Sequence, residues 1–162
     1  MNHAEAKRML EVTTPTDREI VMTRAFDAPR DRVFDAFTKP ELVQRWLLGP
    51  DGWSMIVCDV DLRAGGTFHY AWRNDAEDKQ FGLNGDYREV ARPERIVHAE
   101  RFDQSWYPGD AEVTTTFEER DGTTIVTLTT LFDSREIRDQ AIESGMTDGV
   151  AISFDRLENE LG

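Results

Sequence analysis

A chain of 162 residues, 39% of them hydrophobic and 10% aromatic, is the size of one domain and can bury a core, which excludes a disordered protein. Its 32 acidic and 19 basic residues give a net charge of −13, which repels phosphate groups and argues against nucleic-acid and membrane-surface binding. A single cysteine, no secretory signal and no membrane-spanning run lead us to expect a cytoplasmic protein.

The first part of the chain predicts a leader, a strand and two short helices. Residues 1–16 read as a flexible leader, ahead of one domain over residues 17–162. Residues 18–26 alternate apolar with polar side chains, as a half-buried strand does. Pro29 suits the first position of a short amphipathic helix, and a second short helix is expected over residues 41–46.

From Trp53 onward the hydrophobic period changes to two, which predicts six strands joined by short turns. Ile56, Cys58 and Val60 are expected to share one face of the first of these strands, with Cys58 as a small core side chain. The next strand carries Phe68, Tyr70 and Trp72 on one face, and others are expected over residues 83–90, 96–102, 112–118 and 125–132. Short turns join antiparallel neighbours, so we expect a curved antiparallel sheet of six to seven strands.

The C-terminal stretch predicts one long helix that covers this sheet. Apolar side chains recur at helical spacing over residues 134–161, with Ser134 as N-cap, and such a helix would be about 42 Å long. Gly145 and Gly149 lie at the edge of its apolar stripe, where each costs about 1 kcal/mol relative to alanine. Two explanations stay open: close packing of the helix on the sheet, or space for a ligand between them. The predicted fold class is α+β.

Short motifs, each common by itself, occur here in a distinctive order. They are Arg-Ala-Phe-Asp-Ala-Pro (24–29), Pro-Glu-Leu-Val-Gln-Arg-Trp (40–46), Gly-Pro-Asp-Gly (49–52), Asp-Leu-Arg-Ala-Gly-Gly (61–66), Gly-Asp-Tyr (85–87), Pro-Glu-Arg-Ile (93–96) and the two helix glycines. Over residues 18–161 this set resembles the bacterial relatives of the activator of heat-shock protein 90 ATPase, in the START-like, birch-pollen-allergen-like superfamily. The resemblance implies a helix-grip fold with a cavity between the terminal helix and the sheet, similar to carriers of lipids, sterols and polyketides. Val150 stands where the family often has an aromatic residue, which implies a different pocket shape.

Sequence motifs for metal or cofactor chemistry are absent. The histidines His3, His69 and His98 include no pair at i, i+4 spacing, so we expect no metal site. The chain has no Gly-x-Ser-x-Gly motif and no glycine-rich loop leading from a strand into a helix, so we expect no nucleophilic serine and no cofactor.

Alternation along the strands instead places a set of polar and aromatic side chains on the face of the sheet that borders the expected cavity. If Ile96 and Phe102 face inward, His98 and Glu100 do so too, and such a pair can act in general acid/base catalysis. A strand shifted by one residue would place Val97 and Ala99 inside instead. The side chains expected to contact a ligand are Trp46, Phe68, Tyr70, Trp72, Tyr87, His98, Met146, Gly149, Val150 and Phe154.

Three functions follow from these residues and from the resemblance. The leading hypothesis is a non-enzymatic binder of a small apolar or aromatic molecule, as a monomer or a homodimer. The second is a cyclase- or hydrolase-like enzyme that uses His98 and Glu100. The third is a chaperone-interacting stress-response module with an acidic outer surface. In each of them Trp46 and Trp53, on either side of residues 49–52, would either cover the cavity mouth or anchor that turn.

Overall fold

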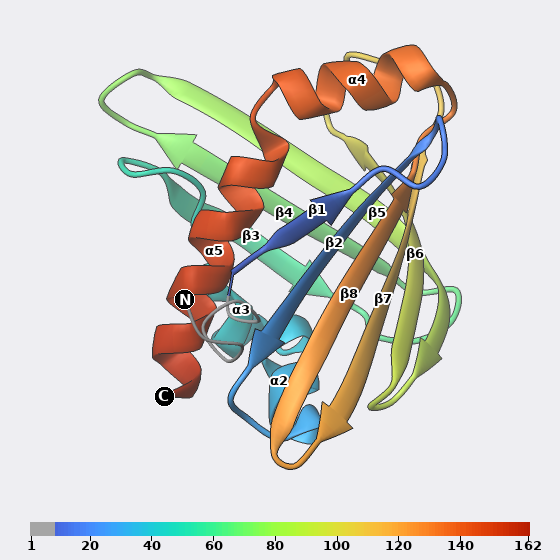
Figure 1. Ribbon diagram of the computed structural model, residues 1–162. Helices are drawn as coiled ribbons and strands as arrows, with labels where there is room; N and C mark the ends of the chain where they lie inside the picture. Colours follow the sequence, from blue (N-terminus) through green and yellow to red (C-terminus); the bar gives the residue numbers. More distant parts are fainter. Residues whose placement is uncertain (1–8) are drawn as a thin grey trace.

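A curved antiparallel sheet lies against the C-terminal helix α5 (Met146–Leu161) in the computed structural model, which describes residues 9–162 (Figure 1). In the described chain the sheet has eight strands in the spatial order β1-β2-β8-β7-β6-β5-β4-β3. Their bounds are β1 Glu11–Thr13, β2 Glu19–Phe26, β3 Ser54–Val60, β4 Thr67–Asn74, β5 Lys79–Ala91, β6 Arg95–Phe102, β7 Ala111–Arg120 and β8 Thr123–Leu131. The predicted α+β class and helix-grip arrangement are confirmed, with one more strand than the upper limit expected.

The extra strand is β1, which lies inside the stretch predicted to be a leader. It pairs antiparallel with β2, with Glu11 opposite Thr23, so the leader prediction is corrected for residues 11–13. Residues 1–8, with His3, lie outside the described residues, and the boundary between leader and domain stays a prediction.

Two short helices, α2 (Arg30–Thr38) and α3 (Pro40–Trp46), connect β2 to β3 as predicted. Their apolar side chains meet those of the C-terminal half of α5, where Phe34 and Leu157 are fully buried. Phe154 packs edge-on against Phe26 of β2, with ring centroids 5.5 Å apart. This end of the molecule is therefore solidly packed.

The predicted single long helix is wrong, because the chain breaks at Gly145. The structure has two helices, α4 (Arg135–Glu143) and α5, which meet at an angle (Figure 1). Gly145 has φ of +87°, a left-handed conformation that glycine adopts without steric cost and that ends a helix. Ile142 therefore does not continue the apolar stripe of α5 and is 36% exposed. The predicted N-cap is confirmed: the Ser134 side chain accepts a hydrogen bond from the backbone N–H of Ile137 at 3.2 Å.

A β-bulge in β3 corrects the predicted alternation of that strand. The register shifts between Met55 and Val57, so Ile56 points outward and is 47% exposed. After the bulge Cys58 pairs with Tyr70, and its half-buried thiol donates a weak hydrogen bond to the Pro40 carbonyl at 3.9 Å. Burial raises the pKa of Cys58 to about 11, as expected for a packed thiol.

No helix in residues 9–162 is both long and apolar enough to span a membrane.

Candidate functional site

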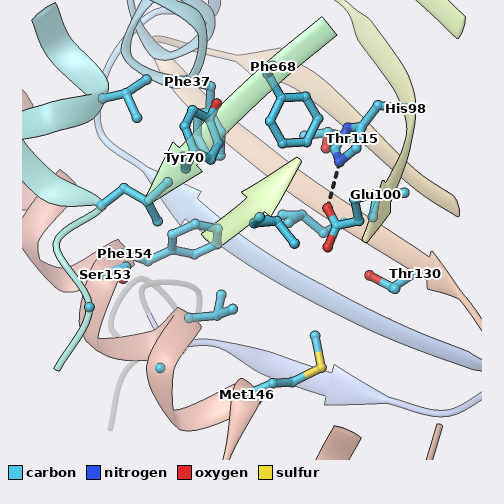
Figure 2. Close-up of a pocket in the computed structure, with 18 of the residues that line it drawn as sticks. Phe37, Phe68, Tyr70, His98, Glu100, Thr115, Thr130, Met146, Ser153 and Phe154 are labelled. Carbon is cyan, nitrogen blue, oxygen red and sulfur yellow. Dashed lines mark hydrogen bonds and ion pairs between the residues drawn. The ribbon is translucent and has the colours of Figure 1, made fainter. Parts of the chain in front are cut away.

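A cavity of about 360 Å³ lies between the N-terminal half of α5 and the sheet. Figure 2 shows Met146 and Phe154 of α5 on one side of this space and Phe68 and Tyr70 of β4 on another. Its wall is formed by apolar, aromatic and a few polar side chains from the sheet, α2, α3, the α3–β3 loop and α5: Met22, Phe37, Val43, Trp46, Leu47, Gly49, Pro50, Phe68, Tyr70, Trp72, Phe81, Leu83, Tyr87, Ile96, His98, Glu100, Val113, Thr115, Leu128, Thr130, Met146, Gly149, Val150, Ser153 and Phe154.

Aromatic rings form the wall that β4 and β5 contribute. The Phe68 ring lies 5.0 Å from that of Tyr70 and 5.5 Å from that of Tyr87, measured between centroids. Burial raises the pKa of Tyr70 well above its usual range and that of Tyr87 to about 12. Both phenols are therefore neutral at physiological pH, and this wall presents no charge to a ligand.

His98 and Glu100 lie on β6 and face the cavity together, as period two predicts. His98 is opposite Tyr87 in the neighbouring strand, and its Nε2 lies 2.7 Å from a Glu100 carboxylate oxygen, as the dashed line in Figure 2 marks. The side chains are 16% and 23% exposed. The one-residue shift that would put Val97 and Ala99 inside is excluded, because neither of them lines the cavity.

Other polar groups of the cavity lie near this pair, on β7 and β8. Figure 2 shows Thr115 and Thr130 on the same side of the space as His98 and Glu100. Neither threonine hydroxyl has a hydrogen-bond partner among residues 9–162, and neither is sealed off from open space. One side of the cavity thus offers free hydrogen-bonding groups, while the wall from β4 and β5 is aromatic.

The two glycines have different roles, which corrects the prediction that both lie at the edge of the apolar stripe of one helix. Gly149 lies in the first turn of α5 and lines the cavity, and a Cβ atom built on it would meet no heavy atom within 4 Å. This agrees with missing side-chain volume between helix and sheet. Gly145 lies outside the cavity wall and ends α4.

The loop between α3 and β3 borders the cavity at the surface, where Pro50 and Phe81 are both exposed and line it. The Trp72 indole N–H donates to the Leu47 carbonyl at 2.8 Å, and Arg156 of α5 donates to the Gly49 carbonyl. These two contacts fasten the loop to the sheet on one side and to α5 on the other.

The two tryptophans that flank this loop anchor it. Trp46 is 3% exposed, and its indole N–H donates to the Ala36 carbonyl at 2.9 Å. Trp53 does not line the cavity; its ring packs edge-on against Phe81, with centroids 5.1 Å apart. Of the two alternatives, a cover over the mouth or an anchor for the turn, the structure shows the anchor.

All ten residues predicted to contact a ligand line this one cavity, and Glu100 lies with them. That they bind a ligand stays a prediction. Sequence reasoning missed Phe37, Leu128, Thr115 and Thr130, among others. The alternation of β7 and β8 was a usable signal for the threonines, since each lies two residues from an apolar side chain of the same wall, Val113 or Leu128.

Comparisons with known proteins agree with this architecture. The family model described as Activator of Hsp90 ATPase homolog 1-like protein matches residues 27–162. A solved structure from Rhodobacter sphaeroides is similar with a TM-score of 0.85 and 24% identity, over 93% of this chain and 97% of that one. A protein from Staphylococcus epidermidis is 30% identical, with a TM-score of 0.78 over 93% of this chain and 92% of its own. One from Mycobacterium smegmatis is 22% identical, with a TM-score of 0.82 over 95% and 97%. No curated protein matches the chain.

Proposed function

We propose that this chain, which belongs to the family of Activator of Hsp90 ATPase homolog 1-like proteins, binds one small apolar or aromatic molecule between α5 and the sheet. The observation that carries the proposal is the cavity itself. Its volume of about 360 Å³ falls in the range of small-molecule sites, and its wall is mainly aliphatic and aromatic with a few polar groups on one side. A mainly apolar space of this size, beside a helix whose other half is tightly packed, fits a binding site better than a packing defect.

Binding of a neutral fluorophore such as phenylnaphthylamine tests the proposal. Saturable fluorescence enhancement is expected, and a ligand present at 100 times its Kd should stabilise the fold by about 2.7 kcal/mol. Gly149→Leu places a side chain into the cavity from a position with free space around its Cβ. It should remove binding while the protein stays folded.

A matched control lies on the same helix, outside the cavity wall. Ile152 is 45% exposed and does not line the cavity, so Ile152→Leu should bind the fluorophore as the unchanged protein does. Equal binding by Gly149→Leu, or no binding by any neutral apolar probe, would contradict the proposal.

An enzymatic role is a second candidate, favoured by the 2.7 Å contact between His98 and Glu100 within a cavity. A carboxylate that accepts from the imidazole can orient it as a general base for cyclase- or hydrolase-like chemistry. Turnover of a panel of aryl esters tests this candidate. His98→Ala should abolish turnover and leave fluorophore binding intact, and a rate equal to that of buffer for the unchanged protein would exclude this hydrolase chemistry.

A chaperone-linked role is a third candidate, and the family description supports it by naming an activator of Hsp90 ATPase. The net charge of −13 gives the outer surface an acidic character suited to a basic partner surface. Co-purification with Hsp90 and a rise in its ATPase rate on addition of this protein are the expected results. No retention and no change in that rate would exclude this role.

A further inference from the structure

We infer that the cavity takes ligands whose polar end is a protonated amine, and that it excludes carboxylic acids. The inference rests on the proposed function and names the chemical class that the site accepts. It follows from three features of the cavity wall: a free acceptor, missing cations and an apolar opposite wall.

The free acceptor is the second carboxylate oxygen of Glu100. One oxygen of Glu100 accepts the hydrogen bond of His98 Nε2 at 2.7 Å. The other accepts no hydrogen bond from any residue between 9 and 162 and is not closed off by protein atoms. A carboxylate can only accept, so His98 Nε2 carries the hydrogen that it donates to Glu100, and the second Glu100 oxygen remains an acceptor for the ligand.

The missing cations decide against an acidic ligand. No lysine or arginine is among the described residues that line the cavity. Arg101, the neighbour of Glu100 in sequence, is held away from the cavity by Asp110, to which its Nε and Nη2 donate at 2.7 and 2.8 Å. A ligand carboxylate would therefore lose its hydration beside the like charge of Glu100, with hydroxyl donors but no lysine or arginine to offset that repulsion, which is costly in an apolar site.

The rest of the wall suits an amine with an apolar body. A protonated primary amine has three N–H donors, and Glu100, Thr115 and Thr130 offer acceptors on the same side of the cavity (Figure 2). Its hydrocarbon body would extend toward Met146 and Phe154 of α5, on the opposite wall. Hydrogen bonds to charged groups are worth more than neutral ones, so the head group decides the preference among ligands with equal bodies.

Octylamine, octanol and octanoic acid differ in the head group and share the same chain length, so they test this inference. Each is titrated against bound phenylnaphthylamine, and displacement gives its Kd. We expect octylamine to bind at least about 100-fold more tightly than octanoic acid, with octanol between them. Glu100→Gln keeps the acceptor for His98 and removes the charge, and it should reduce the ratio of amine to acid affinity by about 10-fold or more.

Two controls separate the Glu100 carboxylate from the general negative field of the protein, which attracts any cation. Glu118→Gln removes one charge at an exposed position on β7, outside the cavity, and should leave the ratio unchanged. The unchanged protein should also keep its ranking at high salt, because salt screens the outer field far more than a half-buried contact.

The outcomes distinguish this inference from the proposed function. If octanol and the fluorophore bind while octanoic acid binds as tightly as octylamine, the inference is overturned and the proposed function stands. An amine preference that survives Glu100→Gln, or that disappears in Glu118→Gln or at high salt, also overturns it. If none of the probes binds, both fail together. The ranking by the unchanged protein is a test even if Glu100→Gln folds poorly.

Discussion

The break between α4 and α5 predicts that alanine has opposite effects at the two glycines of this region. Gly149 is helical and a Cβ atom there meets nothing within 4 Å, so Gly149→Ala gains helix propensity without a clash. The expected stabilisation is about 1 kcal/mol. Gly145 has φ of +87°, and its Cβ would also meet nothing, so the cost of Gly145→Ala is that of the left-handed backbone, about 1–2 kcal/mol.

Urea unfolding and thermal melts measure the difference between these two variants. The two free energies of unfolding should differ by about 2–3 kcal/mol, which corresponds to melting temperatures about 4–12 °C apart for a domain of this size. Ala151→Gly is the control, because it places a glycine inside the same helix and should destabilise by about 1 kcal/mol. Stabilisation by both alanine substitutions would refute the reasoning, since that is what an uninterrupted helix over residues 134–161 predicts.

Three further predictions concern other contacts of the structure. Ser134→Ala removes the N-cap of α4 and should lower the free energy of unfolding by about 1 kcal/mol, whereas Ser134→Thr should stay closer to the unchanged protein. Equal stability of the two variants and the unchanged protein would argue against the cap. The pKa of Cys58 is raised from 9.0 to about 11, so its thiolate fraction at pH 8 is about 100-fold lower than that of an ordinary thiol. Iodoacetamide should therefore react slowly with the folded protein and faster as the pH rises toward 11. Equal rates in folded and urea-unfolded protein would contradict this prediction. Arg156→Gln removes the charged donor that holds the Gly49 carbonyl, so amide hydrogen exchange at residues 49–53 should become faster, whereas unchanged protection would show that Trp72 suffices to hold the loop.

Hydrophobic periodicity was sufficient to predict most strands of the sheet and the sheet residues that line the cavity. Alternation in β4 and β6 put Phe68, Tyr70, His98 and Glu100 on one face, because a strand with one buried face has its register fixed by its apolar residues. The two short helices and the N-cap at Ser134 were also predictable from local residue preferences.

The errors occurred where long-range contacts override a local pattern. Ile56 continues the alternation of β3 in sequence, yet a bulge rotates it outward, and a bulge leaves no trace in hydrophobic spacing. A glycine such as Gly145 is compatible with a position inside a helix and with a position at a helix end, and a helical wheel does not show which backbone conformation it adopts. The stretch at residues 11–13 is short, and its pairing with β2 depends on a neighbouring strand that a local pattern does not reveal.

The cavity was predictable in place but not in the chemistry of its entire wall. Alternation with Val113 and Leu128 was a usable signal for the side of the sheet on which Thr115 and Thr130 lie, but whether another side chain binds their hydroxyls depends on packing between strands. The role of Phe37 depends on how α2 is tilted toward α5, which is a property of packing between elements.

The uneven support of α5 has a consequence for ligand size. Phe154, Leu157 and Leu161 fix the far end of the helix in the larger core cluster. Its first turn borders the cavity at Gly149, packs through Met146 on a smaller cluster, and is joined to α4 through Ser144 and the left-handed Gly145. Because fewer buried side chains support this turn than the far end, we expect a tilt there to change the height of the cavity roof more easily than any movement of the larger core. If the proposed binding function holds, we expect ligands of different thickness to be accommodated at the junction of α4 and α5 rather than by rearrangement of the sheet.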